Sequence, residues 1–502
     1  MSNYTPAKKL AKEASISFSG MGFGQFIRYI FTALLARWVG AEYLGIYSIA
    51  NAVTRISEVI GKMGLDTGVL RFVSKHDGDI EKQKNYIITG MKVGLIFSVV
   101  FMGIQITLSS WLVASIFQGS SLLKIVLITN AISLPFGVLT LIVGSATQGY
   151  KLLKYKIFVA EILNPFILLV VMIISFIFLS KEMTIILPSL ISALVGFIVL
   201  LIFLNKLTGI SIHQIVSTPF SKDLVSFSVP LMFVAMIGSI MHWTDIMMLG
   251  YFTDTETVGL YHPAARTAGL LRTILLAMLG IFSPMMSQFH SQKNYCEMNN
   301  IYQLATRWII TLALPVVLLF LLFPQKVMLL FGGEYLSSAS VLMVLSVAAL
   351  IQAVFGTAGS TLTMTGYSKV NLINALIAAV LNIILNIILI PKFCIIGAAI
   401  ATLISLSLIG VIRYIENWWL NKLQPFNFKV LKSIIAGLVT FGILFYTKQH
   451  IMEYHTILTL FFAGITTFGV YFCLLWLFKF DQDDKDVLGA LKIIGKSLVK
   501  RS

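Results

Sequence analysis

The sequence predicts an all-α polytopic membrane protein with about fourteen transmembrane helices, arranged as two pseudo-symmetric six-helix lobes followed by two C-terminal helices. Three observations lead to this prediction: an apolar composition, an uneven distribution of Lys and Arg along the chain, and an internal repeat. The 502 residues are 58% hydrophobic and only 12% charged, and the mean hydropathy is +0.91. This composition excludes the soluble globular classes.

A membrane-spanning helix needs about 20 mostly apolar residues. Fourteen segments meet this requirement, near Ser15–Trp38, Tyr43–Met63, Ile87–Trp111, Leu122–Thr147, Ile157–Leu179, Met183–Leu204, Leu224–Gly250, Pro263–Gln288, Thr306–Phe323, Ser338–Thr361, Val370–Ile390, Ile396–Trp418, Val430–Tyr446 and Thr456–Phe478. The stretch Met1–Lys12 is polar and basic, and the apolar segment behind it lacks a small-residue cleavage site. We therefore expect a retained helix rather than a cleaved signal peptide.

The loop charges predict the orientation. With the N-terminus placed in the cytoplasm, about 26 Lys and Arg fall in cytoplasmic segments and about 6 in external segments. This positive-inside asymmetry accounts for the net charge of +16 without a nucleic-acid partner. It predicts a multi-pass membrane protein with both termini cytoplasmic. The predicted divisions are 1–212 (first lobe), 213–422 (second lobe), 423–480 (last two helices) and 481–502 (a cytoplasmic tail that forms a short helix).

The chain also resembles itself. Ala41–Ala50 (AEYLGIYSIA) is similar to Thr255–Ala264 (TETVGLYHPA) at an offset of 214, and Gln148–Tyr150 aligns with Thr365–Tyr367 at an offset of 217. We expect the first pair to form the external turn between the first and second helices of each lobe. Since six helices separate the copies, both repeats have the same orientation about an axis along the membrane normal. The alternative is a chance similarity between Gly-Tyr turns.

Charged residues inside the predicted spans are the main functional signal, because each costs roughly 2.5–3.5 kcal/mol at the centre of a helix in the bilayer. The spans contain four arginines: Arg28, Arg55, Arg266 and Arg272. Glu58 and Asp245 are the acids expected at similar depth, whereas Lys92 and Glu161 are expected near the inner interface. About two positive charges then lack an acidic partner, and an anionic substrate in a water-filled cavity would supply the missing charge.

Arginine favours a phosphate ligand, because its planar fork of N–H donors matches phosphate oxygens bidentately. The alternative is structural ion pairing, above all between Arg55 and Glu58 at i, i+3 spacing. Arg266 lies about one turn inside the outer edge and is also able to snorkel.

A second polar group predicts a cation site. Asp245 lies on the seventh span, Asn382 and Asn386 lie one turn apart on the eleventh, and Thr402 lies on the twelfth. Carboxylate, amide and hydroxyl oxygens suit a hard cation such as Na⁺. The alternative is polar contact between helices, which is common for Asn and Thr in membrane bundles.

The remaining candidates predict structure rather than chemistry. The three cysteines, Cys296, Cys394 and Cys473, stand in apolar surroundings and are expected to be buried structural thiols without a disulfide. The glycines of Gly20–Gly24 favour close helix approach or local bending. The sequence has no HExxH, CxxC or GxSxG motif, so we expect no enzyme and no cofactor beyond a coupling Na⁺ or H⁺.

Taken together, the chain resembles polysaccharide or oligosaccharide flippases of the Wzx type, in the multidrug/oligosaccharidyl-lipid/polysaccharide exporter superfamily. The resemblance covers essentially the whole chain. It depends on the fourteen helices in two lobes and on four short segments: Gly45–Tyr47, Gly259–Tyr261, Gln148–Tyr150 and Phe480–Lys485.

The resemblance implies a MATE-like, lipid II flippase-like fold whose lobes rock about a central cavity. It implies that Arg28, Arg55, Arg266 and Arg272 bind the diphosphate of a lipid-linked oligosaccharide. It also implies that Asp245, Asn382, Asn386 and Thr402 hold a sodium ion. Asn386 departs from the lipid II flippase branch, which has an acid there, so the ion and its affinity stay open.

The expected partners are the lipid-linked oligosaccharide, membrane lipids and glycan polymerase and ligase machinery, with the chain acting as a monomer. Two other functions remain open. A drug or cation antiporter of the same superfamily would favour an acidic, aromatic cavity. A non-transporting membrane scaffold for glycan assembly would use the arginines only for ion pairing.

Overall fold

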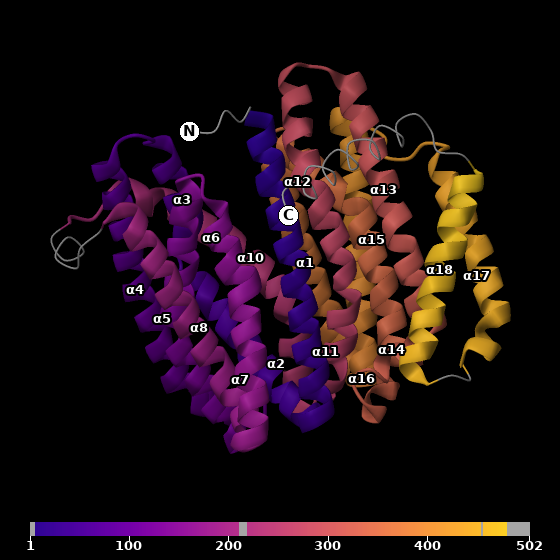
Figure 1. Cartoon of the computed structure of the whole chain (residues 1–502), viewed down its shortest axis with the longest axis horizontal. Helices are drawn as coiled ribbons and strands as arrows, with labels where there is room; N and C mark the ends of the chain where they lie inside the picture. Colours follow the sequence, from indigo (N-terminus) through magenta and orange to yellow (C-terminus); the bar gives the residue numbers. More distant parts are fainter. Residues whose placement is uncertain (1–5, 210–217, 453–454, 479–502) are drawn as a thin grey trace. The chain divides into compact units, whose positions relative to one another are not determined.

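The computed structural model describes residues 6–209, 218–452 and 455–478, and helices make up nearly all of this part. The elements in chain order, labelled as in Figure 1, are α1 (Pro6–Val39), α2 (Ala41–Gly61), α3 (Leu65–Lys75), α4 (Ile80–Trp111), η1 (Leu112–Ile116), α5 (Ser121–Gly149), α6 (Leu153–Ile157), η2 (Phe158–Leu163), α7 (Asn164–Phe178), α8 (Met183–Thr208), α10 (Lys222–Phe252), α11 (Thr255–Ala268), α12 (Leu270–Ser291), α13 (Tyr295–Leu322), α14 (Pro324–Met328), η3 (Gly333–Ser338), α15 (Ala339–Met364), α16 (Ser368–Asn421), α17 (Val430–Met452) and α18 (Thr456–Leu477). No strand occurs among the described residues, so the predicted all-α class is confirmed. The tail after Phe480 lies outside them.

Eleven helical stretches of the described chain are long and apolar enough to cross a membrane. One of them is α16, whose 54 residues contain two of the predicted spans. The helical run of α16 is interrupted at Cys394, where φ is 49° and ψ is −129°, between these two spans. The other two predicted spans correspond to α1 and α2, which are not among the eleven. Each of the fourteen predicted spans therefore coincides with described helix.

Contacts between residues divide the chain into two units. The N-terminal unit comprises Glu13–Pro263 and Ala379–Ala401, and the C-terminal unit comprises the described parts of Met1–Lys12, Ala264–Ala378 and Thr402–Ser502. This grouping by contacts does not test the predicted lobes at 1–212 and 213–422, which remain predictions.

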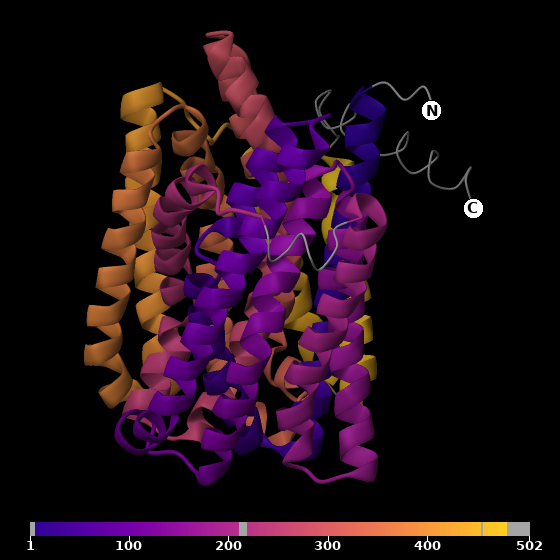
Figure 2. The same ribbon diagram turned by 90° about the vertical axis from the view of Figure 1, so that its left-hand side faces the viewer.

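In the N-terminal unit, α4, α5 and α8 run side by side, as Figures 1 and 2 both show. Their shared core also includes residues of α3, an 11-residue helix that lies between two of the predicted spans. Leu65, Val69 and Val73 recur every four residues on α3 and are fully buried against neighbours such as Ile142. A helix this short does not register as a span, although its apolar face follows the helical period.

In the C-terminal unit, α12, α13 and α15 pack around a core that includes Phe282, Met298 and Tyr302. Helices α17 and α18 lie side by side and contact α13, and Figure 1 shows them as an orange and yellow pair. Tyr471 of α18 is fully buried at this contact, next to Leu314 of α13. Within this unit, the last two spans thus pack against α13.

The repeated segments 41–50 and 255–264 are helical and do not form the external turns that the sequence analysis expected. Gly45 of α2 faces Thr255 and Gly259 of α11, and a Cβ at Gly45 would lie 2.9 Å from the nitrogen of Gly259. Reciprocally, a Cβ at Gly259 would overlap the carbonyl of Ala41 and lie 3.0 Å from the nitrogen of Gly45. Since 41 and 255, like 45 and 259, differ by the repeat offset of 214, this contact has the reciprocity that a two-fold axis produces.

We expect Gly45→Ala and Gly259→Ala to destabilise the protein by about 2 kcal/mol or more each, because the added methyl group meets facing backbone that cannot rotate away. Thermal unfolding of the purified protein measures this effect. Gly238→Ala on α10 is the matched control, since a Cβ there has nothing within 4 Å. Equal stability of Gly45→Ala and Gly238→Ala would contradict the close backbone contact.

The expectation of buried cysteines is wrong. Cys296, Cys394 and Cys473 are all free and exposed. In a membrane protein the outer faces of helices carry large apolar side chains, such as Leu438 and Trp476, which are also exposed. Apolar surroundings in the sequence therefore do not indicate burial here, because lipid takes the place of the core.

The exposed cysteines provide a test of the predicted orientation. Cys296 lies at the start of α13 on the predicted cytoplasmic side, and Cys394 lies at the break in α16 on the predicted external side. In intact cells we expect a membrane-impermeant maleimide to label Cys394 and to leave Cys296 unlabelled until the membrane is opened. Single-cysteine variants measured by mass shift separate the two sites. Labelling of Cys296 in intact cells would reverse the predicted orientation.

Candidate functional site

The N-terminal unit contains two of the four predicted arginines, and a carboxylate holds each of them. Arg28 of α1 donates from Nη1 to Oε2 of Glu161 at 2.8 Å and from Nη2 to the carbonyl oxygen of Ala160 at 2.8 Å. Both acceptors belong to the π-helical turn η2. Glu161 was expected near the inner interface without a special role, so the sequence-based charge count missed the acid that neutralises Arg28.

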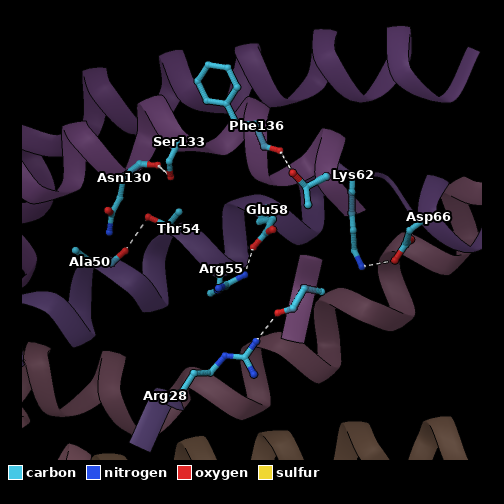
Figure 3. Close-up of polar contacts among 12 residues, drawn as sticks. Arg28, Ala50, Thr54, Arg55, Glu58, Lys62, Asp66, Asn130, Ser133 and Phe136 are labelled. Atoms are coloured by element: carbon cyan, nitrogen blue, oxygen red, sulfur yellow. Dashed lines mark hydrogen bonds and ion pairs between the residues drawn. The ribbon is translucent and has the colours of Figure 1, made fainter. Parts of the chain in front are cut away.

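Arg55 pairs within its own helix. Its Nη1 donates to Oε2 of Glu58 at 2.7 Å, one turn further along α2, and Figure 3 shows this contact. The Glu58 side chain is nearly buried, and a Cβ at Gly137 of α5 would lie 3.2 Å from its Oε1. The Arg55 side chain is 55% exposed. A half-exposed arginine on a predicted membrane helix has to face water or a ligand rather than lipid.

Arg266 and Arg272 belong to the C-terminal unit. Arg266 lies in the last turn of α11 and is partly buried by other groups, and Arg272 lies in the first turn of α12, where its side chain is exposed. Gly269 separates the two helices, and its N–H donates to the carbonyl of Ala265. The expectation that all four arginines meet at one ligand remains a prediction.

The predicted cation residues form a hydrogen-bonded cluster within the N-terminal unit. Asn386 of α16 donates from Nδ2 to Oδ1 of Asp245 on α10 at 3.1 Å and to Oδ1 of Asn382 at 3.1 Å. Asn386 is fully buried and Asn382 is nearly so. The structure thus brings together three of the four predicted residues. Thr402 belongs to the C-terminal unit, and its part in the cluster remains a prediction.

Tyr261 of α11 completes this cluster and was missed by the sequence analysis. Its hydroxyl donates to Oδ2 of Asp245 at 2.8 Å, and its side chain is buried. The offset of 214 aligns Tyr261 with Tyr47 and Asp245 with Phe31, so the two copies differ at the acid and not at the tyrosine. In the other copy Phe31 and Tyr47 form an aromatic pair with ring centroids 5.4 Å apart. One copy of the repeat therefore has an apolar pair where the other has a carboxylate and its donor.

The residues of the cluster suit a hard cation. Oδ1 of Asn386 is buried and accepts no hydrogen bond from the described residues. A half-turn of the Asn386 amide exchanges its Oδ1 and Nδ2, and would present oxygen to Asp245 and Asn382. Carboxylate and amide oxygens are the ligands that such ions prefer. Among the described residues, no three His, Cys, Asp or Glu lie together in a way that could hold a metal ion.

Another polar network lies in the C-terminal unit and was not expected from the sequence. Asn417 of α16 donates to the carbonyl of Ala358 at 2.9 Å, and Asn421 donates to the hydroxyl of Thr365 at 3.1 Å. Asn374 donates to the carboxylate of Glu416. These bonds tie the two ends of α16 to each other and to α15, so we interpret this network as structural.

Comparison with protein families gives two matches. A family described as polysaccharide biosynthesis protein matches residues 10–290, which is more than half of the chain. The MatE family matches residues 230–388.

Individual relatives match the chain over different lengths. An uncharacterized membrane protein of Methanocaldococcus jannaschii is 25% identical over 89% of this chain and 90% of its own length. A probable low-salt glycan biosynthesis flippase, Agl15 of Haloferax volcanii, is 27% identical over 42% of this chain and 46% of its own length. Among solved structures, the lipid II flippase MurJ in its inward closed conformation superposes with a TM-score of 0.73 at 16% identity, covering 92% of this chain and 98% of that one. At this identity the likeness concerns the fold.

Proposed function

The chain belongs to the polysaccharide biosynthesis protein family, and from this premise we propose that it is a flippase for polyprenyl-diphosphate-linked oligosaccharides. In this proposal it moves a polysaccharide repeat unit from the cytoplasmic to the outer leaflet of the plasma membrane. Two relatives, one described as a probable low-salt glycan biosynthesis flippase and one as a probable flippase, support the transport class. The fold shared with a lipid II flippase supports a large amphiphilic substrate.

The main support for a diphosphate as ligand comes from Arg28 and Arg55. Both guanidinium groups lie on helices expected to cross the membrane, and both side chains remain partly exposed, at 30% and 55%. Each arginine already pairs with a carboxylate, and its exposed part leaves it accessible to a further anion. A diphosphate offers several oxygens in the geometry that guanidinium groups bind bidentately. Arg266 and Arg272 complete the proposed set of four.

Cation coupling is the second part of the proposal. Asp245, Asn382, Asn386 and Thr402 would hold Na⁺, or Asp245 would take up H⁺, and Tyr261 would orient the carboxylate. The bound cation would supply the positive charge that draws the amide and carboxylate oxygens together. A coupling ion shifts an alternating-access equilibrium only through its different affinity for the two states. Binding at a cluster shared by α10, α11 and α16 would therefore favour the state in which these helices are close.

Complementation of a flippase-deficient strain tests the proposal. We expect the wild-type chain to restore surface glycan, and Arg28→Ala, Arg55→Ala and Arg272→Ala to fail at normal membrane protein levels. Normal surface glycan with all three variants would remove the diphosphate site. Reduced protein levels instead of reduced activity would favour a scaffold with structural ion pairs.

The match of residues 230–388 to the MatE family favours one other function, a drug or cation antiporter. Such a transporter binds cations, and arginines at its site would repel them. Uptake of organic cations into vesicles distinguishes the two functions. Cation uptake that is unaffected by a polyprenyl diphosphate would favour the antiporter.

A further inference from the structure

The contact between Arg28 and Glu161 depends on a close approach of α1. Gly20, Gly24 and Arg28 recur every four residues and so lie on one face of this helix. A methyl group at Gly20 would overlap the side chain of Ile157, and one at Gly24 would lie 2.9 Å from Oε2 of Glu161. Gly22, on another face, has nothing within 4 Å. The two glycines therefore bring Arg28 within reach of η2.

The π-helical turn η2 shapes the acceptor side. It spans Phe158–Leu163, where the N–H of Asn164 donates to the carbonyl five residues earlier, that of Val159. Pro165 comes next and has no N–H to donate in the same pattern to the carbonyl of Ala160. A π turn inside a membrane helix leaves backbone carbonyls available to other donors. The carbonyl of Ala160 accepts from Arg28 in this way. The backbone carbonyl and the carboxylate thus form a two-point acceptor for the guanidinium.

This two-point acceptor occupies the Arg28 donors that a phosphate would use. Nη1 and Nη2 form the outer edge of the guanidinium, the edge that binds two oxygens of a phosphate in parallel. In this structure Glu161 and Ala160 take both of these nitrogens. The side chains of Arg28 and Glu161 are 30% and 25% exposed, so the pair is accessible to a ligand. A phosphate that binds this edge has to displace the carboxylate.

Arg55 differs in this respect. Its pair with Glu58 uses one guanidinium nitrogen, within one helix, and the rest of the side chain is exposed. Arg55 can therefore bind a phosphate while it stays paired. Arg28 has to exchange one anion for another.

We propose that Glu161 is a resident counter-ion of Arg28 that the diphosphate of the substrate displaces. Competition from its charge lowers the affinity for the substrate and thereby speeds substrate release. This inference rests on the proposed function and adds a positioning residue to it. Without substrate, Glu161 neutralises Arg28 inside the membrane. With substrate, the carboxylate competes for the same two nitrogens, which keeps the bound state from becoming too stable. When the diphosphate leaves, Glu161 returns.

The test compares binding and transport in the purified full-length chain. The probe for binding is a fluorescent polyprenyl diphosphate in nanodiscs, with the matching neutral polyprenol as reference. We expect Glu161→Gln to bind the diphosphate about tenfold more tightly than wild type and to translocate it more slowly once bound. Gln keeps an acceptor for Arg28, so it removes the competing charge with the smallest change in packing. Glu161→Asp, which keeps the charge, should behave like wild type.

A double-mutant cycle ties the effect to Arg28. In an Arg28→Gln background, Glu161→Gln should no longer tighten binding. Asp66→Asn is the matched control, because Asp66 is also a carboxylate paired with a cation, Lys62 at 2.7 Å, in the same unit. We expect it to leave diphosphate affinity unchanged.

The outcomes separate the inference from the proposed function. If the wild-type chain binds the diphosphate no better than the neutral polyprenol, the proposed substrate class fails, and the inference fails with it. If the wild-type chain prefers the diphosphate but Glu161→Gln binds it equally or more weakly, only the inference fails. Tighter binding that persists without Arg28 would also overturn it.

Discussion

Substitution of Arg28 by Ala is expected to lower the rate of substrate translocation about a hundredfold or more, at normal amounts of folded protein. Two charge-assisted hydrogen bonds to phosphate are lost, and each contributes about 1.5–3 kcal/mol. Arg28→Lys should fall between wild type and Ala, because Lys keeps the charge but lacks the fork of donors. The initial rate in proteoliposomes measures the effect, with membrane protein quantified in parallel.

Two further variants separate an effect on transport from an effect on folding. Arg28→Ala leaves Glu161 without its cation in the membrane, and Glu161→Gln removes that unpaired charge, so the double variant should be present at the normal level and should still fail to transport. Arg71→Ala is the matched control, since Arg71 of α3 packs over the ring of Phe227 of α10, 4.2 Å from its centroid, and is not one of the four proposed arginines. Translocation by Arg28→Ala at the rate of Arg71→Ala would contradict a role in substrate binding.

Substitution of Asp245 by Asn is expected to abolish the response of transport to an imposed cation gradient and to lower the driven rate at least about tenfold. Asn has nearly the shape of Asp; its one amide oxygen still accepts from Tyr261, and a half-turn of the Asn386 amide lets Asn386 accept from its NH2 group, so the cluster should stay folded. It lacks the charge that a cation needs for binding. Translocation in proteoliposomes with an imposed Na⁺ or H⁺ gradient measures the response and identifies the ion.

Asp254→Asn is the matched control for this substitution. Asp254 is an exposed acid just before α11 and accepts from the N–H of Thr257 at 2.7 Å, a helix-capping contact that Asn also makes. We expect this variant to keep the full gradient response. An Asp245→Asn variant that responds like Asp254→Asn would leave the cluster with a structural role only.

The sequence predicted the spans well because long apolar runs are local signals. It also located Asp245, Asn382 and Asn386, since polar residues are rare enough within such runs to stand out. Whether these residues meet depends on helix packing, and here helical spacing helped: Asn382 and Asn386 lie one turn apart on one face of α16 and reach the same carboxylate.

The partner of Arg28 could not be predicted in this way. Arg28 and Glu161 are 133 residues apart in sequence, and their contact needs the glycine face of α1 and the π turn η2. Neither the depth of Glu161 nor a π turn has a clear sequence signature, although Pro165 marks the place in retrospect. The exposed cysteines were mispredicted because lipid-facing and buried positions share the same apolar surroundings.

The repeat contains more information than the common orientation of its two copies. The offset of 214 relates the two glycines at the crossing of α2 and α11, and it relates the pair Asp245 and Tyr261 to the pair Phe31 and Tyr47. A residue that is polar in one copy and apolar in the other indicates a function that only one copy has. Comparison of the copies position by position singles out Asp245, which aligns with Phe31, whereas Tyr261 aligns with another tyrosine, Tyr47.

The most direct test of the proposed function is reconstitution. The purified chain is placed in proteoliposomes with a fluorescent polyprenyl-diphosphate-linked oligosaccharide, and translocation is followed by quenching the outer leaflet with a membrane-impermeant reductant. The proposed function predicts that the wild-type chain accelerates translocation of this lipid over protein-free vesicles, and that Arg28→Ala does not. Equal rates with the wild-type chain and in protein-free vesicles would contradict the central claim.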